Sequence, residues 1–282
     1  MKNQWKYLVC FWLMAACTKE TNKTTSENGV VTIRGQQYVL DWSDEFEYSG
    51  LPDSSKWDYE TGYVRNNETQ YYTDARIENC KVSNGLLHIT ARNDSFDAHP
   101  VTSASIETSG KKEFKYGLIE VRAKMPHLGS GTWPAIWMKG VNDYIVGWPK
   151  CGEIDIVEWV GKAPVVALGS IYSQAEGSTK YAERHWPYIS LNSDFFTKQF
   201  HNYAIEWDST QIKFFVDNNN YVTYTKQDLG VDWEPMMKAQ YLKLNLAMGG
   251  IIPPIGGGGD IDYTKFPYTF EVEYARYYKR VR

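Results

Sequence analysis

The sequence predicts an all-β protein in which two antiparallel sheets pack face to face. Residues 119–125 alternate apolar and charged side chains, which is the period of a strand with one buried face. Residues 201–225 form three such segments, separated by the turn-forming runs Asp208-Ser-Thr210 and Asp217-Asn-Asn-Asn220. Helical periodicity is almost absent. Half-buried strands of this kind cover their apolar faces by pairing two sheets.

A further strand is expected between Leu242 and Met248. Its leucines and Met248 share one face, which leaves Lys243, Asn245 and Ala247 on the other. The stretch 249–260, rich in glycine and proline, is the least regular part of the chain. We expect it to overhang a cleft.

Length and composition fit one sandwich domain and argue against nucleic acid as a partner. The chain has 282 residues, and its formal net charge of -4 becomes -6 once Lys2 and Lys6 leave with a leader. No basic patch is visible. Trp, Tyr and Phe make up 15% of the residues, more than a core of this size requires. Aromatic rings suit the apolar faces of sugars, although more than half are expected in the core.

Three carboxylates lie within a stretch that is otherwise typical of a buried strand, Gly152-Glu-Ile-Asp-Ile-Val-Glu-Trp159. Side chains alternate faces along a strand, so Glu153 and Asp155 share one face and Glu158 falls on the other. One extra residue, Val157 or a neighbour, must therefore form a β-bulge that returns Glu158 to the side of the other acids. Charged residues on one face of an apolar strand indicate a functional site.

Two glutamates on one rigid face, with a third carboxylate between them, suit retaining glycoside hydrolysis. In that reaction two carboxyl groups about 5–5.5 Å apart act as nucleophile and as general acid/base. The Cα atoms of Glu153 and Glu158 would lie roughly 13 Å apart, and side chains that lean over a concave sheet can close much of that distance. Mutual repulsion would raise the pKa of at least one acid, which can then stay protonated near neutral pH.

The segment 148–161 resembles the signature of glycoside hydrolase family 16, in its bulged form and its laminarinase-like branch. Other segments resemble the family in order and at sensible spacing. They are Asp44-Glu-Phe46, Asn66-Asn-Glu-Thr-Gln-Tyr-Tyr72, Tyr116-Gly-Leu-Ile-Glu-Val-Arg-Ala-Lys-Met-Pro126, Gly131-Thr-Trp-Pro-Ala-Ile-Trp137, Phe200-His-Asn-Tyr-Ala-Ile-Glu-Trp207 and Leu244-Asn-Leu-Ala-Met-Gly-Gly250. The resemblance covers roughly Tyr38 to the C-terminus, and residues 36–282 are expected to form the catalytic domain.

The resemblance implies a two-sheet β-jelly-roll sandwich with a concave substrate cleft, and a retaining, endo-acting β-glycosidase. It implies that Glu153 is the nucleophile, Glu158 the general acid/base and Asp155 the helper between them. No cofactor is expected for catalysis. Relatives often bind a structural calcium ion, for which Glu45 and Glu273 are candidate ligands by position; a plain surface role for both is at least as well supported.

Aromatic and polar residues near the acids are expected to hold the sugar chain. Trp133 follows Gly131-Thr132 and precedes Pro134, a loop-edge setting that favours exposure and sugar contact. For Trp137, a sugar platform and a core position are equally supported. Trp159 should point away from the acids and pack in the core. The expected substrate-binding residues are Asn67, Glu68, Trp133, Trp137, Tyr172 and Asn245, with Arg65 and Trp148 as weaker candidates.

Two positions depart from the laminarinase-like pattern, and both bear on the substrate. Relatives carry a histidine in a Gly-Thr-x-His stretch, where Gly169-Ser-Ile-Tyr172 has Tyr172, and their Gly-Gly-x-Trp run is replaced by Gly249-Gly-Ile-Ile252. Internal cleavage of a β-1,3- or β-1,4-linked glucan remains the main hypothesis. The alternative is an endo-β-galactosidase acting on a mucin O-glycan, keratan or algal galactan. A non-catalytic carbohydrate-binding jelly roll is less well supported, because binding alone does not require three acids.

The N-terminus has the features of an export signal. Lys2 and Lys6 precede a short apolar run, and Met14-Ala-Ala-Cys17 resembles a bacterial lipoprotein signal. We therefore expect a signal peptide over 1–16, lipidation of Cys17 and a flexible tether over 17–35. The expected location is the outer membrane or surface of a Gram-negative cell, with the periplasm as the alternative. The membrane would be contacted only through the lipid anchor.

Two cysteines remain after the leader and the lipid-bearing residue are set aside. Cys80 and Cys151 are expected to be buried thiols rather than a disulfide, because a sandwich of this size does not need one. No CxxC or HExxH motif is present, so no catalytic metal is indicated. The protein is expected to be a monomer.

Overall fold

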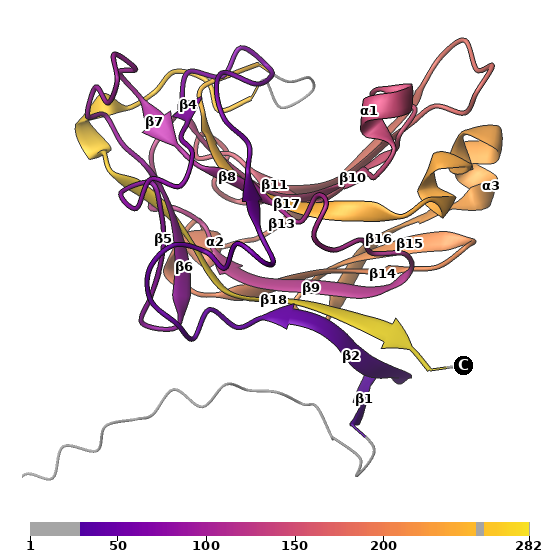
Figure 1. The fold of residues 1–282 in the computed structure, drawn as a ribbon. Helices are drawn as coiled ribbons and strands as arrows, with labels where there is room; N and C mark the ends of the chain where they lie inside the picture. The colour runs from indigo at the N-terminus through magenta and orange to yellow at the C-terminus, as the bar shows by residue number, and fades with distance from the viewer. Residues whose placement is uncertain (1–28, 252–256, 282) are drawn as a thin grey trace, which may run out of the picture.

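The computed structural model describes residues 29–251 and 257–281, and these form two antiparallel sheets packed on each other (Figure 1). In strand order, the first sheet contains β1 (Val30–Ile33), β2 (Gln36–Asp44), β18 (Tyr268–Arg280), β9 (Gly117–Lys124), β14 (His201–Trp207), β15 (Gln211–Val216) and β16 (Asn219–Thr225), with β5 (Cys80–Ser83) and β6 (Leu86–Ala91) joined through β18. The all-β sandwich prediction is confirmed.

The second sheet carries the run of acids at its centre. Its strand order is β13 (Ala182–Ile189), β12 (Val166–Ser173), β11 (Glu153–Trp159), β10 (Thr132–Gly140), β17 (Gln240–Met248), β8 (Ser105–Glu107) and β3 (Asp58–Tyr59). A small parallel pair, β4 (Tyr71–Tyr72) and β7 (Thr102–Ser103), lies beside it. The three-strand meander expected in 201–225 is present as β14, β15 and β16.

Short helices occur only between strands in the described ranges. They are α1 (Asp143–Val146), α2 (Phe195–Lys198), α3 (Lys226–Leu229) and the 3-10 turns η1 (Gly230–Trp233), η2 (Pro235–Met237) and η3 (Tyr263–Lys265). No helix within the described residues is long and apolar enough to cross a membrane.

The core lies between the two sheets and follows the alternation visible in the sequence. The even-numbered residues of β17 from Leu242 to Met248 are buried in it, as are Ile154 and Trp159 of β11. Trp159 therefore packs away from the cleft, as predicted. Each large apolar side chain buried here contributes on the order of 1.5–3 kcal/mol relative to an exposed one. Cys80 and Cys151 are both buried and free, which confirms the expectation of two thiols.

The tether ends earlier than the sequence indicated. Residues 17–35 were expected to lack regular structure, but Val30–Ile33 form β1 and pair with residues 36–39 of β2. The physical reason is a short alternation: Val31 and Ile33 are buried in a small cluster with Tyr38. Cys17 and the expected signal peptide lie outside the described residues.

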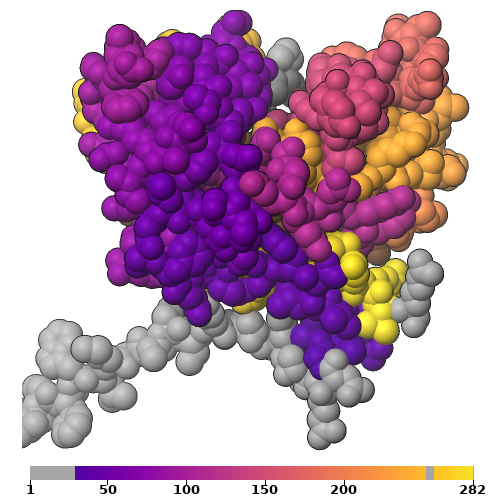
Figure 2. Space-filling view, viewed as in Figure 1, coloured from indigo at the N-terminus to yellow at the C-terminus, as the bar shows by residue number. Residues whose placement is uncertain are grey.

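The outer face of the second sheet is hollowed between two raised groups of segments. In Figure 1, β4 and β7 rise above one side of this sheet, and α1 and α3 rise above the other. Figure 2 shows the hollow between them at the molecular surface. The acids of β11 face this hollow, so the architecture places them at the floor of a cleft.

Candidate active site

A β-bulge in β11 brings the three acids to one face. Across β10, Trp137 pairs with Asp155 and Ile136 with Val157, so the intervening Ile156 has no partner. The register against β12 also shifts between Asp155 and Glu158. Ile156 and Val157 are both buried in the core. The bulge expected from side-chain parity is therefore present, and it turns Glu158 toward the cleft with the other two acids.

Burial raises the pKa of all three acids, and repulsion between carboxylates adds to this effect at Asp155 and Glu158. Burial, followed by repulsion from Glu153, raises the pKa of Glu158 to about 7. Burial likewise raises the pKa of Glu153 to about 7, against the attraction of Arg65 and nearby lysines. The pKa of Asp155 is raised well above its usual range, first by burial and then by its two neighbours. Groups this close titrate as one coupled set, so the site can offer an acid and a carboxylate together near neutral pH.

The hydrogen-bond partners of the acids differ. Trp133 Nε1 donates to Glu158 Oε1 at 3.2 Å, and the Ser170 hydroxyl lies within hydrogen-bonding reach of the same carboxyl. Glu153 accepts a hydrogen bond from the Trp148 side chain. The Oδ2 atom of Asp155 is buried and has no hydrogen-bond partner among the described residues. The carboxyl between the two glutamates therefore has one buried oxygen without a hydrogen-bond partner among the described residues.

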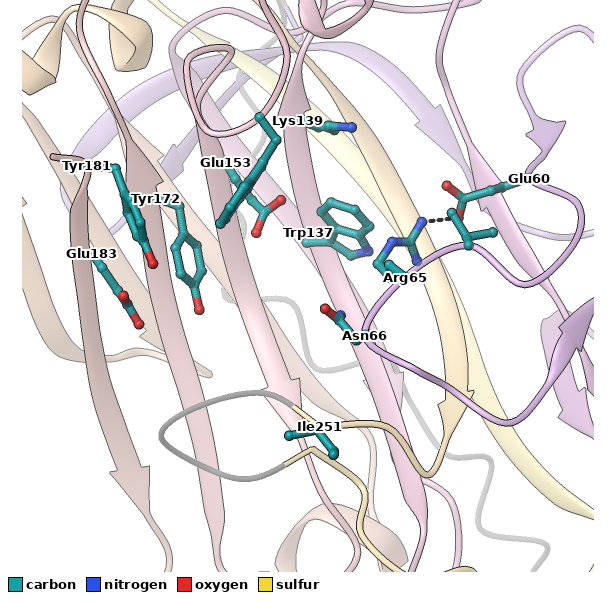
Figure 3. Close-up of a pocket in the computed structure, with 12 residues that line it drawn as sticks. Glu60, Arg65, Asn66, Trp137, Lys139, Glu153, Tyr172, Tyr181, Glu183 and Ile251 are labelled. Atoms are coloured by element: carbon teal, nitrogen blue, oxygen red, sulfur yellow. Dashed lines mark hydrogen bonds and ion pairs between the residues drawn. The ribbon is translucent and has the colours of Figure 1, made fainter. Parts of the chain in front are cut away.

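The larger cavity of the cleft, about 470 Å³, opens beside Glu153. Figure 3 shows Trp137 on one side of this carboxylate and Tyr172 on the other, with Tyr181 and Glu183 farther out. A smaller cavity of about 50 Å³ adjoins Glu158, Glu68 and Trp133. The acids therefore lie along a continuous polar and aromatic floor, because residues such as Glu153 and Trp137 line both cavities.

Two cations lie close to the ring of Trp137. The guanidinium of Arg65 and the Nζ of Lys243 each lie 5.0 Å from its ring centroid. Its Nε1 donates to Asn245 Oδ1 at 2.8 Å. Both cations are paired with Glu60, which Figure 3 shows for Arg65. Such contacts fix the ring plane, which favours the platform hypothesis for Trp137 over the core hypothesis.

Several other predicted residues are brought together at the cleft. Asn245 Nδ2 donates to the Tyr72 hydroxyl at 2.9 Å, and that hydroxyl donates to Glu68 Oε2 at 3.2 Å. Tyr172 and Trp148 line the larger cavity, with ring centroids 5.6 Å apart.

Two predicted binding residues are placed differently from expectation. Trp133 is not an exposed loop-edge residue; it lies inside β10, pairs with Ala247 and is only 4% exposed. Asn67 is exposed and lines neither cavity, whereas its neighbour Asn66 lines both. Both asparagines have positive φ angles, and this tight left-handed turn directs Asn66 to the cleft (Figure 3).

Sequence reasoning missed the outer strands of the site. Glu183 and His185 of β13 face the acids across Ser170 of β12, and Glu60 reaches the cleft from a distant loop. Lys243 could have been found from the sequence, because it lies on the same face of β17 as Asn245.

The carboxylates of Glu45 and Glu273 do not fit a calcium site as they are arranged. Glu45 accepts two hydrogen bonds from Arg276, and Glu273 accepts one from Arg122. Within the described residues, no group of three or more His, Cys, Asp and Glu side chains could hold a metal ion. A guanidinium group already neutralises each carboxylate. As arranged, neither residue offers a calcium ion an uncompensated negative charge.

A rigid strand that presents two glutamates around a third acid, at the floor of an aromatic cleft, defines the site of a carboxylate-dependent glycoside hydrolase. The model of glycosyl hydrolases family 16 matches residues 67–265. The chain therefore belongs to glycosyl hydrolases family 16.

Relatives agree with this assignment in sequence and in structure. A β-glucanase of Rhodothermus marinus is 40% identical over 257 residues, 88% of this chain and 87% of the relative. The X-ray structure of the laminarinase from Rhodothermus marinus matches with a TM-score of 0.77 at 38% identity, covering 88% of this chain and 100% of that one. A keratan-sulfate endo-1,4-β-galactosidase of Sphingobacterium multivorum is 33% identical over 275 residues, 94% of this chain and 59% of the relative.

Proposed function

We propose that this protein is a retaining endo-β-glucanase that hydrolyses internal β-1,3 or β-1,4 bonds of a glucan. The observation that carries the proposal is the bulge of β11, which puts Glu153 and Glu158 on one face of a rigid strand at the floor of the cleft. Two carboxyl groups presented in this way are what a double-displacement reaction needs.

In the first step, Glu153 attacks the anomeric carbon while Glu158 gives its proton to the leaving oxygen. A covalent glycosyl ester forms on Glu153 as the glycosidic bond breaks. In the second step, Glu158 takes a proton from water, and the resulting hydroxide displaces Glu153. Both glutamates return to their starting protonation states. The raised pKa of Glu158, about 7, keeps its proton available for the first step.

The glucan assignment follows relatives of matching length, namely the β-glucanase and laminarinase of Rhodothermus marinus. One observation favours a second candidate, an endo-β-galactosidase. Tyr172 and Ile251 line the larger cavity, whereas the laminarinase-like pattern has a histidine at the first position and a tryptophan beside the second. Ile252, which occupies the tryptophan position itself, lies outside the described residues. A sugar with a different hydroxyl orientation would use such a change.

Product analysis tests both candidates. The protein lacking residues 1–17 would be incubated with laminarin, mixed-linkage glucan, agar-type galactan and keratan or mucin glycans, and early products would be sized. Medium-length oligosaccharides from the glucans are expected, and none with Glu153→Gln. Cleavage of the galactose-containing chains alone would refute the glucanase proposal. Release of only monosaccharides would refute endo action.

We also propose that the chain is exported and anchored through a lipid on Cys17. The support is the sequence Met14-Ala-Ala-Cys17 behind a charged and apolar leader. Mass spectrometry of the membrane-extracted protein should find an N-terminal, lipid-modified Cys17. Cys17→Ala should release the protein from the membrane fraction, and a Cys10→Ala control should not. Unmodified Cys17 in the purified protein would exclude the anchor.

A further inference from the structure

A line of four side chains runs from the acid of β11 across β12 to β13. Ser170 is fully buried, and its hydroxyl lies within hydrogen-bonding reach of Glu158, whose pKa it lowers when it donates to that carboxyl. His185 Nδ1 lies 3.0 Å from the same hydroxyl oxygen, since Ser170 and His185 are paired across the two strands. On the far side, His185 Nε2 lies 2.6 Å from Glu183 Oε1. Glu183 also lines the larger cavity of the cleft.

The number of hydrogens in this line restricts how it can be arranged. A carboxylate only accepts, so Glu183 requires a hydrogen on Nε2 of His185. In a neutral imidazole, Nδ1 then has a lone pair and must accept from Ser170. The serine has a single hydroxyl hydrogen. Once that hydrogen is donated to His185, Ser170 has only lone pairs to present to Glu158, and these suit a protonated carboxyl.

We propose that Glu183 and His185 act as positioning residues that turn the Ser170 hydroxyl away from Glu158 and so keep the general acid in its protonated form. The inference rests on the proposed function, because it assigns Glu158 as the acid. The line Glu183, His185, Ser170, Glu158 then has one donor and one acceptor at every contact. Glu183 fixes the tautomer of His185. That tautomer fixes the direction in which the Ser170 hydroxyl donates, and so determines what Ser170 presents to Glu158.

Other charged groups near Glu158 do not replace this line. Glu153 and Asp155 on β11 and Glu68 from the neighbouring loop all face it as acids, and Arg65 is the cation that lines the same cavity. Around His185, Tyr172 of β12 packs edge-on with ring centroids 5.2 Å apart, and Glu183 is the carboxylate in contact. Repulsion among the acids favours a proton on one of them without selecting which. The line from Glu183 through His185 and Ser170 ends at Glu158, so it favours the protonated form of that residue.

The change His185→Phe tests the proposal, because it keeps a ring against Tyr172 and removes both nitrogens. Ser170 would then be free to donate to the ionised form of Glu158. The basic limb of kcat/KM on a soluble glucan should move to lower pH by about 0.5–1 unit. In a Ser170→Ala background the same change should no longer move the limb. Trp186→Phe, one residue along β13 and pointing to the other face, serves as the control and should leave the limb in place.

Three results would overturn the proposal. If His185→Phe moves the limb to higher pH, His185 acts as a cation that favours ionised Glu158. An equal shift in the Ser170→Ala background would show an effect through space rather than through the hydroxyl. A lower kcat with an unmoved limb would show a purely structural role.

Nitrogen NMR of histidine-labelled wild-type protein gives a second readout that needs no activity. His185, assigned from backbone correlations, should carry its hydrogen on Nε2 and none on Nδ1 at mildly alkaline pH, where imidazoles are neutral. A hydrogen on Nδ1 would overturn the proposal even if His185→Phe failed to fold. If the tautomer is as expected but no glycan is cleaved, the proposed function fails and the tautomer assignment stands.

Discussion

The indole Nε1 of Trp133 donates a hydrogen bond to Glu158 Oε1 across 3.2 Å. The donor belongs to β10 and the acceptor to the bulged part of β11, so the contact depends on the irregular register of these two strands. A donor favours the ionised carboxyl and therefore lowers the pKa of Glu158, opposing burial and the repulsion of Glu153. The pKa of about 7 is the balance of these opposed effects.

Trp133→Phe should move the basic limb of kcat/KM to higher pH. The substitution keeps an aromatic ring but removes the donor, so the pKa of Glu158 rises and the acid stays protonated further into the alkaline range. An increase of about 0.5–1 unit is expected. Trp137→Phe is the matched control, because its indole donates to Asn245 instead. If both variants move the limb equally, the Trp133 hydrogen bond is not responsible.

Azide should separate the roles of the two glutamates. With Glu153→Ala and an activated aryl glucoside, azide replaces the lost nucleophile and should give a glycosyl azide of inverted configuration. With Glu158→Ala, azide attacks the covalent intermediate on Glu153 and should give the retained configuration. Proton NMR of the products distinguishes the two anomers. Exchanged outcomes would reverse the assignment of nucleophile and acid/base, and an inverted product from wild type would rule out double displacement.

Glu158→Gln should stabilise the fold at alkaline pH and have little effect at acidic pH. The folded pKa of Glu158, about 7, lies above the ordinary value of 4.5, so the folded state holds a proton that the unfolded state releases. Stability from this group is present below about pH 4.5 and is lost as pH rises through about 7. The variant avoids that loss. We expect a gain on the order of 1–3 kcal/mol at pH 8.

Thermal melts at pH 4.5 and pH 8 would measure this effect. A gain of 1 kcal/mol corresponds to about 2–4 °C in Tm for a domain of this size. Glu176→Gln removes an exposed carboxylate and serves as the control, with a change of Tm near zero at both pH values. A gain that is the same at pH 4.5 and at pH 8 would contradict a raised pKa as its cause.

The central strand of the site was predictable from sequence because its information is local. Alternation in 153–158 and 242–248 assigns each side chain to a face, and the displaced position of Glu158 required a bulge. The structure confirms the bulge, the cleft-facing positions of Asn245 and Ala247, and the inward position of Trp159. The family resemblance added the roles of the acids.

The parts that could not be predicted depend on register and on long-range contacts. Nothing in the sequence near His185 places it opposite Ser170, because that pairing is set by the length of the β12–β13 loop. Glu60 and Lys243 lie 183 residues apart and meet only after both sheets have formed. The sequence predicts an exposed loop edge for Trp133, because glycine and proline near it are typical of a loop. This prediction is wrong, since tertiary packing includes Trp133 in β10.

The buried lysine of β17 offers a test of what holds the cleft floor together. Lys243 is 2% exposed, donates to Glu60 Oε1 at 3.0 Å and is also paired with Glu107. Burial alone would raise the pKa of Glu60, but attraction to Arg65 and Lys243 outweighs it and lowers the value to about 2. Because one cation neutralises two carboxylates and packs on Trp137, its loss affects both the fold and the sugar platform.

Lys243→Met should destabilise the protein by about 3 kcal/mol at pH 7, because two partly buried carboxylates lose a shared partner. The folded pKa of Glu60 is depressed, so its contribution is present above about pH 4.5 and is lost as pH falls toward 2. The difference between wild type and variant should therefore shrink in acid. Urea unfolding at pH 7 and pH 3.5 measures it. Lys238→Met, which removes only an exposed ion pair with Glu234, should cost less than about 1 kcal/mol. Equal stability of Lys243→Met and wild type at pH 7 would mean that the cost of burying this lysine offsets its two ion pairs.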